Sequence, residues 1–172
     1  MKRIIFIIMF LSLLTGCTSN TDKTEEYKGE ELRIGVIGDA PEVRENQIKF
    51  EEIDFGILRS NEFNSMYDAI FITKDNFREA SNAEYVPIYK NSKIPFCFLD
   101  NKKAYVNFIN EDLQYEDEPN WKEGTYIDGM LYIKDRYWGY GLYNDIRSEA
   151  NIKGVYSRVF KDISKIKNNE LP

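Results

Sequence analysis

The chain contains no histidine, so its chemistry has to come from carboxylates, lysines, tyrosines, serines or cysteines. This absence excludes Ser-His-Asp and Cys-His nucleophilic systems, imidazole general bases and His-ligated zinc or copper. Two carboxylates and one amine could act together, because Asp39, Lys74 and Asp100 each follow an apolar, strand-like segment. If these segments are parallel strands of one sheet, the three groups meet beyond the strands' carboxyl ends, where open α/β sheets bind ligands.

Such a group could bind a cation, or could carry out general acid–base chemistry if the pKa values of the two carboxyl groups were driven apart. Strand ends are also exposed to solvent and usually polar, so a purely structural origin for the three residues stays open. The sequence makes them candidate ligand-binding residues, and we assign no metal ion and no cofactor to them.

Aromatic residues crowd the segment from 121 to 143, which contains Trp121, Tyr126, Tyr132, Tyr137, Trp138, Tyr140 and Tyr143. On an exposed face, such rings form a platform for sugars, cationic groups or a protein partner, whereas on an inner face they belong to the core. The alternation in "TYIDGMLYI" favours aliphatic side chains pointing inward and tyrosines pointing outward. We therefore treat Trp138 and Tyr140 as candidate ligand-binding residues.

An acidic run, "EDLQYEDEPNWK", lacks the spacing and the glycine of an EF-hand loop. We interpret it as a solvated loop, and calcium binding of another kind stays open. Similarly, "GVIGDAP" lacks both nucleotide-binding glycine patterns, since Pro41 and not a glycine begins the next segment. Gly35 and Gly38 are better explained by close packing and a tight turn.

The N-terminal half alternates between strands and helices. Strands are predicted over 32–38, 48–55, 67–73 and 94–99, with a helical turn over 41–47, a weak helix over 58–66 and a helix from Asp75 toward Pro87. This alternation is typical of βαβ units with right-handed crossovers. The prediction is an α/β fold with a small mostly parallel sheet and flanking helices.

The C-terminal half predicts a β-hairpin and a terminal helix. Segments 125–133 and 137–143 are rich in β-forming residues and are joined by a short polar connection. From Ile152 to Ile166, apolar residues recur at helical spacing, with Asn151 as the expected N-cap. This amphipathic terminal helix should close one face of the sheet, so residues 32–168 form a single α/β globular domain.

The N-terminus has the layout of a secretory signal peptide over residues 1–16. Lys2 and Arg3 precede an apolar stretch from Ile4 to Leu14, and the small residues Thr15 and Gly16 follow it. The apolar stretch is too short for a transmembrane helix, which needs about 20 apolar residues.

The residues Leu14-Thr15-Gly16-Cys17 resemble the lipobox of bacterial lipoproteins. The resemblance implies a diacylglyceryl group on the sulfur of Cys17 and a mature chain that begins there. Two acyl chains give stable membrane anchorage, whereas one chain holds only marginally. A chance cysteine after an ordinary signal peptide is the alternative. The polar residues after Cys17 predict a flexible, solvated tether over 17–31.

With Cys17 assigned to lipid, no intramolecular disulfide is expected, because Cys97 is the only other cysteine. The continuous apolar run "IPFCFL" predicts Cys97 as a small hydrophobe in the core. A reactive thiol would need an electropositive and partly exposed setting.

The segments "YDAIFIT", "YVPIYKNSKIPFCFLD" and "YWGYGLYND" are similar to small uncharacterised lipoproteins of Gram-positive bacilli. That resemblance implies the outer face of a cell membrane and brings no catalytic motif. Losing Lys2 and Arg3 with the signal peptide takes the formal charge from −6 to −8, which argues against nucleic acid as a partner.

The sequence therefore predicts a membrane-anchored extracytoplasmic lipoprotein that acts as a binding or interaction module. Its partner, beyond the membrane that holds the lipid, is an unknown protein, a wall component or a small molecule. The alternative is a carboxylate-dependent hydrolase or transferase at the cell surface.

Overall fold

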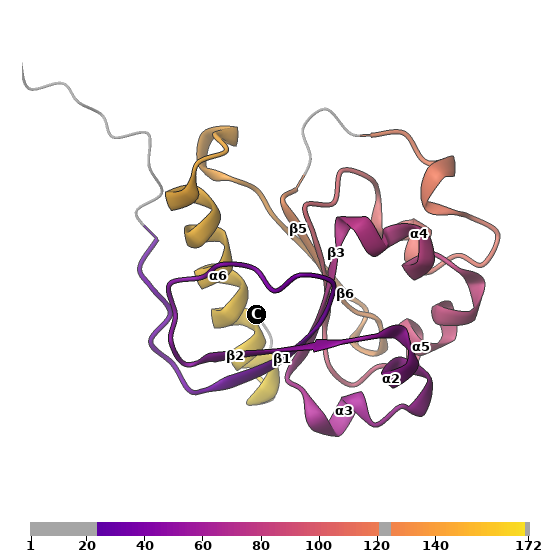
Figure 1. Cartoon of the computed structure of the whole chain (residues 1–172), viewed down its shortest axis with the longest axis horizontal. Coiled ribbons are helices and arrows are strands. Elements are labelled where there is room, and N and C mark those ends of the chain that lie inside the picture. Colours follow the sequence, from indigo (N-terminus) through magenta and orange to yellow (C-terminus); the bar gives the residue numbers. More distant parts are fainter. Residues whose placement is uncertain (1–23, 121–124, 171–172) are drawn as a thin grey trace, which may run out of the picture.

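The computed structural model describes residues 24–120 and 125–170, which form one six-stranded sheet between two helical layers (Figure 1). The predicted signal peptide, Cys17 and Trp121 lie outside the described residues. The strands are β1 (Leu32–Ile37), β2 (Ile48–Ile53), β3 (Ala69–Thr73), β4 (Phe96–Leu99), β5 (Ile127–Leu131) and β6 (Arg136–Tyr140). Their order across the sheet is β2-β1-β3-β4-β5-β6.

The predicted mostly parallel sheet is wrong, because the sheet is mixed. Strands β2, β1, β3 and β4 run parallel, but β5 pairs antiparallel with β4, and β6 pairs antiparallel with β5. In its described part, the connection from β4 to β5 contains only the short 3-10 helices η3 (Tyr105–Phe108) and η4 (Tyr115–Asp117). Without a helix to carry the chain back across the sheet, it returns beside β4 in the opposite direction. The predicted hairpin is present as β5 and β6, and it extends the sheet beyond β4.

Short helices cover one face of the sheet, on the right in Figure 1. They are α2 (Phe55–Ser60), α3 (Phe63–Met66), α4 (Phe77–Ala80) and α5 (Val86–Asn91), with the 3-10 helices η1 (Lys74–Asn76) and η2 (Ala83–Tyr85). The single helix predicted from Asp75 to Pro87 is broken into several turns. Pro87 lies in the first turn of α5, where its missing N–H is not needed, so it begins a helix instead of ending one.

Two further local predictions are wrong. Segment 41–47 contains no helical turn. The helix predicted over 58–66 is two helices, because Asn61 adopts a left-handed conformation with φ of 60° and ends α2. Asparagine tolerates this conformation better than most residues do.

The terminal helix α6 (Glu149–Lys167) covers the other face of the sheet and confirms the amphipathic pattern. It begins earlier than predicted, because Ser148 is the N-cap and its side chain accepts a hydrogen bond from the backbone N–H of Asn151. Asn151 is instead buried inside the helix, where its amide donates to the carbonyl of Ile146. The predicted cap is therefore replaced by a residue three positions earlier.

Each face of the sheet has its own apolar core. On the α6 side, Phe71 of β3 stacks on Phe160 of α6, with ring centroids 6.4 Å apart. On the other side, Phe98 of β4 stacks on Phe108 of η3 at 3.8 Å. Cys97 is buried in the core under α6, which confirms the prediction of a core cysteine, and burial raises the pKa of its thiol.

The described end of the predicted tether is packed against the domain. Tyr27 is only 4% exposed and lies 6.2 Å from Phe160, centroid to centroid. Its backbone N–H and carbonyl bond to side chains of the loop between β1 and β2. Residues 24–31 are also held at both ends, because Arg44 donates to the carbonyl of Thr24 and the end of α6 binds Glu30. None of the helices in the described part of the chain combines the length and apolar character needed to cross a bilayer.

Candidate functional site

The structure brings together two of the three polar residues predicted at the strand ends. The Nζ atom of Lys74 lies 3.8 Å from Oδ2 of Asp100, at the carboxyl ends of β3 and β4. Asp39 is exposed, and its side chain makes no hydrogen bond or ion pair with any residue that the structure describes. The predicted cluster of two carboxylates and an amine is thus reduced to one ion pair.

Arg147 joins the ion pair of Lys74 and Asp100, and it was not among the residues predicted from the sequence. It forms a bidentate pair with Asp100, with Nη1–Oδ1 and Nη2–Oδ2 distances of 2.9 and 3.2 Å. Its guanidinium lies 5.3 Å from the centroid of the Tyr126 ring, and the hydrogen bond to Asp100 raises the pKa of Arg147. The sequence shows only that Arg147 precedes the terminal helix, so its partner could not be predicted.

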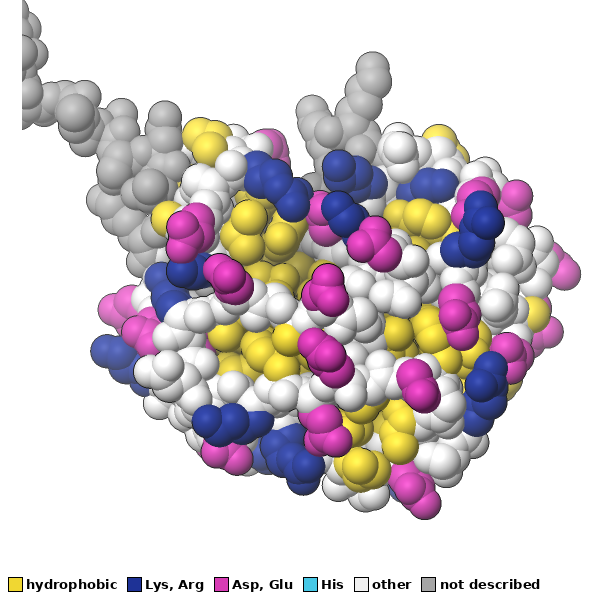
Figure 2. All heavy atoms as spheres, viewed as in Figure 1, with side chains coloured by type: hydrophobic (Ala, Val, Ile, Leu, Met, Phe, Trp, Pro, Cys, Tyr) yellow, Lys and Arg dark blue, Asp and Glu magenta, His cyan; other side chains and the backbone are white. Residues whose placement is uncertain are grey.

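Beside Arg147, the surface forms a crevice with a volume of about 480 Å³. Pro41 and Glu42 come from the loop after β1, and Tyr126 immediately precedes β5. The start of α6 and the residue before its N-cap supply Arg147, Ser148, Glu149, Ile152, Lys153 and Tyr156. Figure 2 shows hydrophobic side chains sunk into the surface beside the first turns of α6, with basic and acidic side chains around them.

The crevice combines an apolar floor with two cations, Arg147 and Lys153, which pair with Asp100 and Glu149, respectively. Tyr156 is buried, Tyr126 is half-buried, and burial raises the pKa of both phenols, so both rings are neutral at physiological pH. Asp100 uses two N–H groups of Arg147, and the remaining three make no hydrogen bond to any described residue. The 19-residue helix α6 also points its positive end here. The arrangement suits a ligand with an anionic group attached to an apolar body.

Two other crevices have a more polar lining, and a cation in each of them is bound by two side chains. In the first, behind the ends of β1 and β2, Arg59 is held by Glu84 and by the hydroxyl of Tyr85. In the second, at the amino ends of β1 and β3, Lys167 is held by Glu30 and Asp68.

The hairpin does not present the predicted ligand-binding aromatic residues on an open face. Tyr140 is 6% exposed, and its hydroxyl donates to Oδ2 of Asp162 at 2.7 Å. Trp138 is half-buried and lies across Gly129, its partner on β5. The prediction assumed one inner face, but the hairpin belongs to a sheet that is covered on both faces.

One carboxyl group among the described residues has a raised pKa, and it lies outside the crevice. Asp128 accepts hydrogen bonds from Thr125 and Asn101, each at 2.5 Å, and burial raises its pKa. In the acidic run, Glu116 is bound to Arg78 at 2.7 Å. Within residues 24–120 and 125–170, no group of three or more acidic or cysteine side chains could hold a metal ion.

Comparisons of the chain with protein-family models, with curated proteins and with solved structures give no match. Any function of the crevice therefore has to be inferred from its own geometry.

Substitution of Gly129 by alanine is expected to destabilise the protein by about 1–3 kcal/mol, because the added Cβ would overlap the indole of Trp138 in a packed sheet. Urea unfolding followed by circular dichroism would measure the loss. Gly141→Ala is the matched control, because a Cβ there meets nothing within 4 Å. Equal stabilities of the two variants would contradict this packing of Trp138 on Gly129.

The raised pKa of Asp128 predicts the sign of a pH effect. The folded state holds this proton more tightly than the unfolded state, so the contribution of Asp128 to stability is present at low pH. It is lost as the pH rises through the folded-state pKa. Relative to Asp128→Asn, which cannot titrate, the free energy of unfolding of the wild type should therefore fall as the pH rises from about 4. A wild type that gains stability relative to the variant over this range would show that the assigned direction is wrong.

Proposed function

We propose that this chain is a lipid-anchored, extracytoplasmic binding module on the outer face of a cell membrane. The support for anchorage is the N-terminal pattern, in which Lys2, Arg3 and an apolar stretch lead to Leu14-Thr15-Gly16-Cys17. We further propose that the domain binds a small molecule with an anionic group and an apolar body in the crevice beside Arg147.

The observation that carries the binding proposal is the setting of Arg147. Asp100 and the ring of Tyr126 fix its guanidinium before any ligand arrives. A planar guanidinium recognises carboxylate or phosphate groups with paired hydrogen bonds, and less freedom is lost on binding when the side chain is already held. Lys74, which also pairs with Asp100, adds a second positive charge nearby.

The carboxylate-dependent hydrolase or transferase receives less support from the same geometry. Such an enzyme needs two titratable groups with separated pKa values facing one cavity. Asp39 stands apart from Asp100, and Asp128, which has the raised pKa, does not line the crevice. A binding role needs only Arg147, Asp100 and Tyr126, which already lie together.

Anchorage predicts that Cys17→Ser moves the protein from the membrane fraction to the soluble fraction, because the acylated sulfur is lost. Cell fractionation with immunoblotting measures the shift, and mass spectrometry of the wild type should detect the diacylglyceryl group on residue 17. Cys97→Ala is the matched control and should stay with the membrane, since Cys97 is buried in the core. A serine variant that remains equally attached would overturn the anchorage.

Binding at the crevice predicts that benzoate and phenyl phosphate shift the amide NMR signals of Tyr126 and Ile152 and bind more tightly than neutral benzamide. Arg147→Gln should weaken binding of both anions at least about tenfold, because each charged hydrogen bond contributes about 1.5–3 kcal/mol. Arg136→Gln, a change on the exposed hairpin outside the crevice, is the control. Unchanged affinity in Arg147→Gln, or benzamide binding as tightly as benzoate, would exclude an anion site here.

A further inference from the structure

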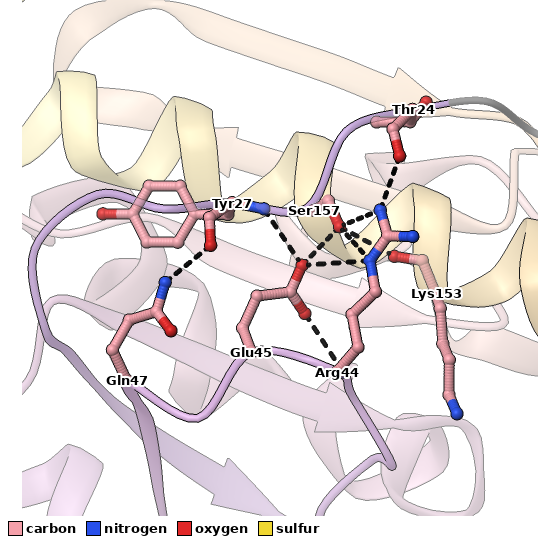
Figure 3. Close-up of polar contacts among 7 residues, drawn as sticks. All are labelled: Thr24, Tyr27, Arg44, Glu45, Gln47, Lys153 and Ser157. Carbon is pink, nitrogen blue, oxygen red and sulfur yellow. Dashed lines mark hydrogen bonds and ion pairs between the residues drawn. The ribbon is translucent and has the colours of Figure 1, made fainter.

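The first part of the segment from Thr24 to Glu31 is held by groups around one buried carboxylate (Figure 3), and its last part is held by the end of α6, where Asn168 and Lys167 bind Glu30. The side chain of Glu45 has no exposed surface, and its Oε1 atom accepts a hydrogen bond from the backbone N–H of Tyr27 at 3.3 Å. Gln47, in the same loop, donates to the carbonyl of Tyr27 at 2.6 Å. Both backbone polar groups of Tyr27 are therefore bound by side chains of the loop.

The same carboxylate is tied to helix α6. The hydroxyl of Ser157 donates to Oε1 of Glu45 and accepts from Nη2 of Arg44 at 2.7 Å. The same Nη2 atom donates to the carbonyl of Thr24, also at 2.7 Å. We call Arg44, Glu45 and Ser157 the latch, because together they bind the N-terminal segment, the loop and α6 to one another.

We propose that the latch fixes which face of the domain lies toward the membrane, and that the crevice opens on that face. This inference rests on the proposed lipid anchorage at Cys17. Its surface partner is the bilayer itself, and the orientation depends on how far the chain can reach between Cys17 and the first latched residue.

The reach with the latch closed is shorter than the domain is wide. From Cys17 to Thr24 there are seven steps along the chain, which span at most about 25 Å even when fully extended. A domain of about 145 residues has a radius of gyration near 15 Å and hence a diameter of about 38 Å. The face opposite Thr24 therefore cannot reach the membrane surface.

With the latch open and Tyr27 released, the free chain would extend to Glu30, which Asn168 and Lys167 of the α6 end still bind. Thirteen steps from Cys17 to Glu30 then span up to about 47 Å, which exceeds the diameter, so every face could meet the membrane. Closure of the latch thus decides between a restricted and an unrestricted orientation.

The crevice lies on the restricted side because it shares both walls with the latch. Glu42 of the crevice and Arg44 of the latch belong to the same loop, and Lys153 and Ser157 are one turn apart on α6. Figure 1 shows the described chain beginning beside α6, with helices α2–α5 on the other side of the sheet. The crevice therefore receives ligands in the layer next to the bilayer, and the α2–α5 face points away.

The test couples the mature chain through the Cys17 thiol to a maleimide lipid in zwitterionic phosphatidylcholine nanodiscs that carry gadolinium on some headgroups. Cys97 is buried, so coupling occurs at one site. Isoleucine methyl NMR then compares Ile152 in the crevice with Ile57 and Ile88 on the opposite side. Because the reach is shorter than the diameter, relaxation of Ile152 should be enhanced at least about fivefold more than that of the other two.

Two variants test the cause. Tyr27→Ala combined with Arg44→Ala and Glu45→Ala removes the buried ring and the bonds to Thr24 and to the Tyr27 N–H, and it should bring the three methyl groups toward equal enhancement. If that variant does not fold, a chain with fifteen Gly and Ser residues inserted before Thr24 lengthens the reach while leaving the latch intact, and it should give the same result. Equal enhancement in the unaltered chain, or an unchanged contrast with the long insertion, would overturn the proposal. Because the lipid is attached chemically, this outcome is separate from whether cells acylate Cys17.

Discussion

The buried carboxylate of Glu45 constrains the arrangement of everything around the first strand. An ionised carboxylate without water costs several kcal/mol unless hydrogen bonds and an opposite charge compensate it. Here the compensating groups come from three separate segments: the backbone of Tyr27, the neighbouring Arg44, and Ser157 on α6. The carboxylate can be buried only when those segments are assembled, so side-chain bonds contribute to the shape of the irregular loop 38–47 beside the backbone bond from Ile48 to Glu45.

That loop matters because of its place in the topology. Strand β1 lies between β2 and β3 in the sheet. The chain first adds β2 on one side of β1 and then crosses back to add β3 on the other side. The loop after β1 joins the crevice beneath α6, whereas the connection after β3 forms α4 and α5 in the other layer. Connections that diverge at a switch point leave a hollow at the strand ends, which is where open α/β sheets bind ligands. Arg147 and Tyr126 line this hollow from the C-terminal half of the chain.

Patterns within short stretches of the sequence predicted most of the individual strands and the terminal helix. The strands, the hairpin and α6 follow from apolar period, turn residues and amphipathic spacing, and the core position of Cys97 follows from its apolar run. The mixed sheet could not be foreseen, because strand direction depends on what the connection from β4 to β5 does in three dimensions. Polarity suggested a free tether over residues 17–31, but one buried tyrosine and the bonds to its backbone outweigh that average composition.

Only part of the candidate site could be predicted, because some of its residues are brought together by the order of the strands and others by contacts between distant segments. Asp100 and Lys74 follow strands that lie side by side, so the topology of the parallel part brings them together. Asp39 follows β1, where the chain turns away with the loop. Arg147 lies 47 residues beyond Asp100, and no periodicity or spacing links the two. Trp138 and Tyr140 had the right composition for an open platform, but neighbours on both faces of the sheet cover them.

The acidic body and the short reach together determine what Arg147 encounters. Under the proposed anchorage, the chain that begins at Cys17 carries a formal charge of −8, so anionic lipids repel it and the covalent lipid rather than surface attraction would keep the domain near the membrane. At physiological ionic strength that repulsion is screened beyond about 8 Å, whereas the latched segment lets the domain stand up to about 25 Å away. The crevice can therefore lie close to the membrane and yet outside its negative potential. There the local field comes from the charges in and beside the crevice, in which Arg147, Lys74, Lys153 and the positive end of α6 stand against Asp100, Glu42 and Glu149, and the lipid headgroups do not exclude a dissolved anion.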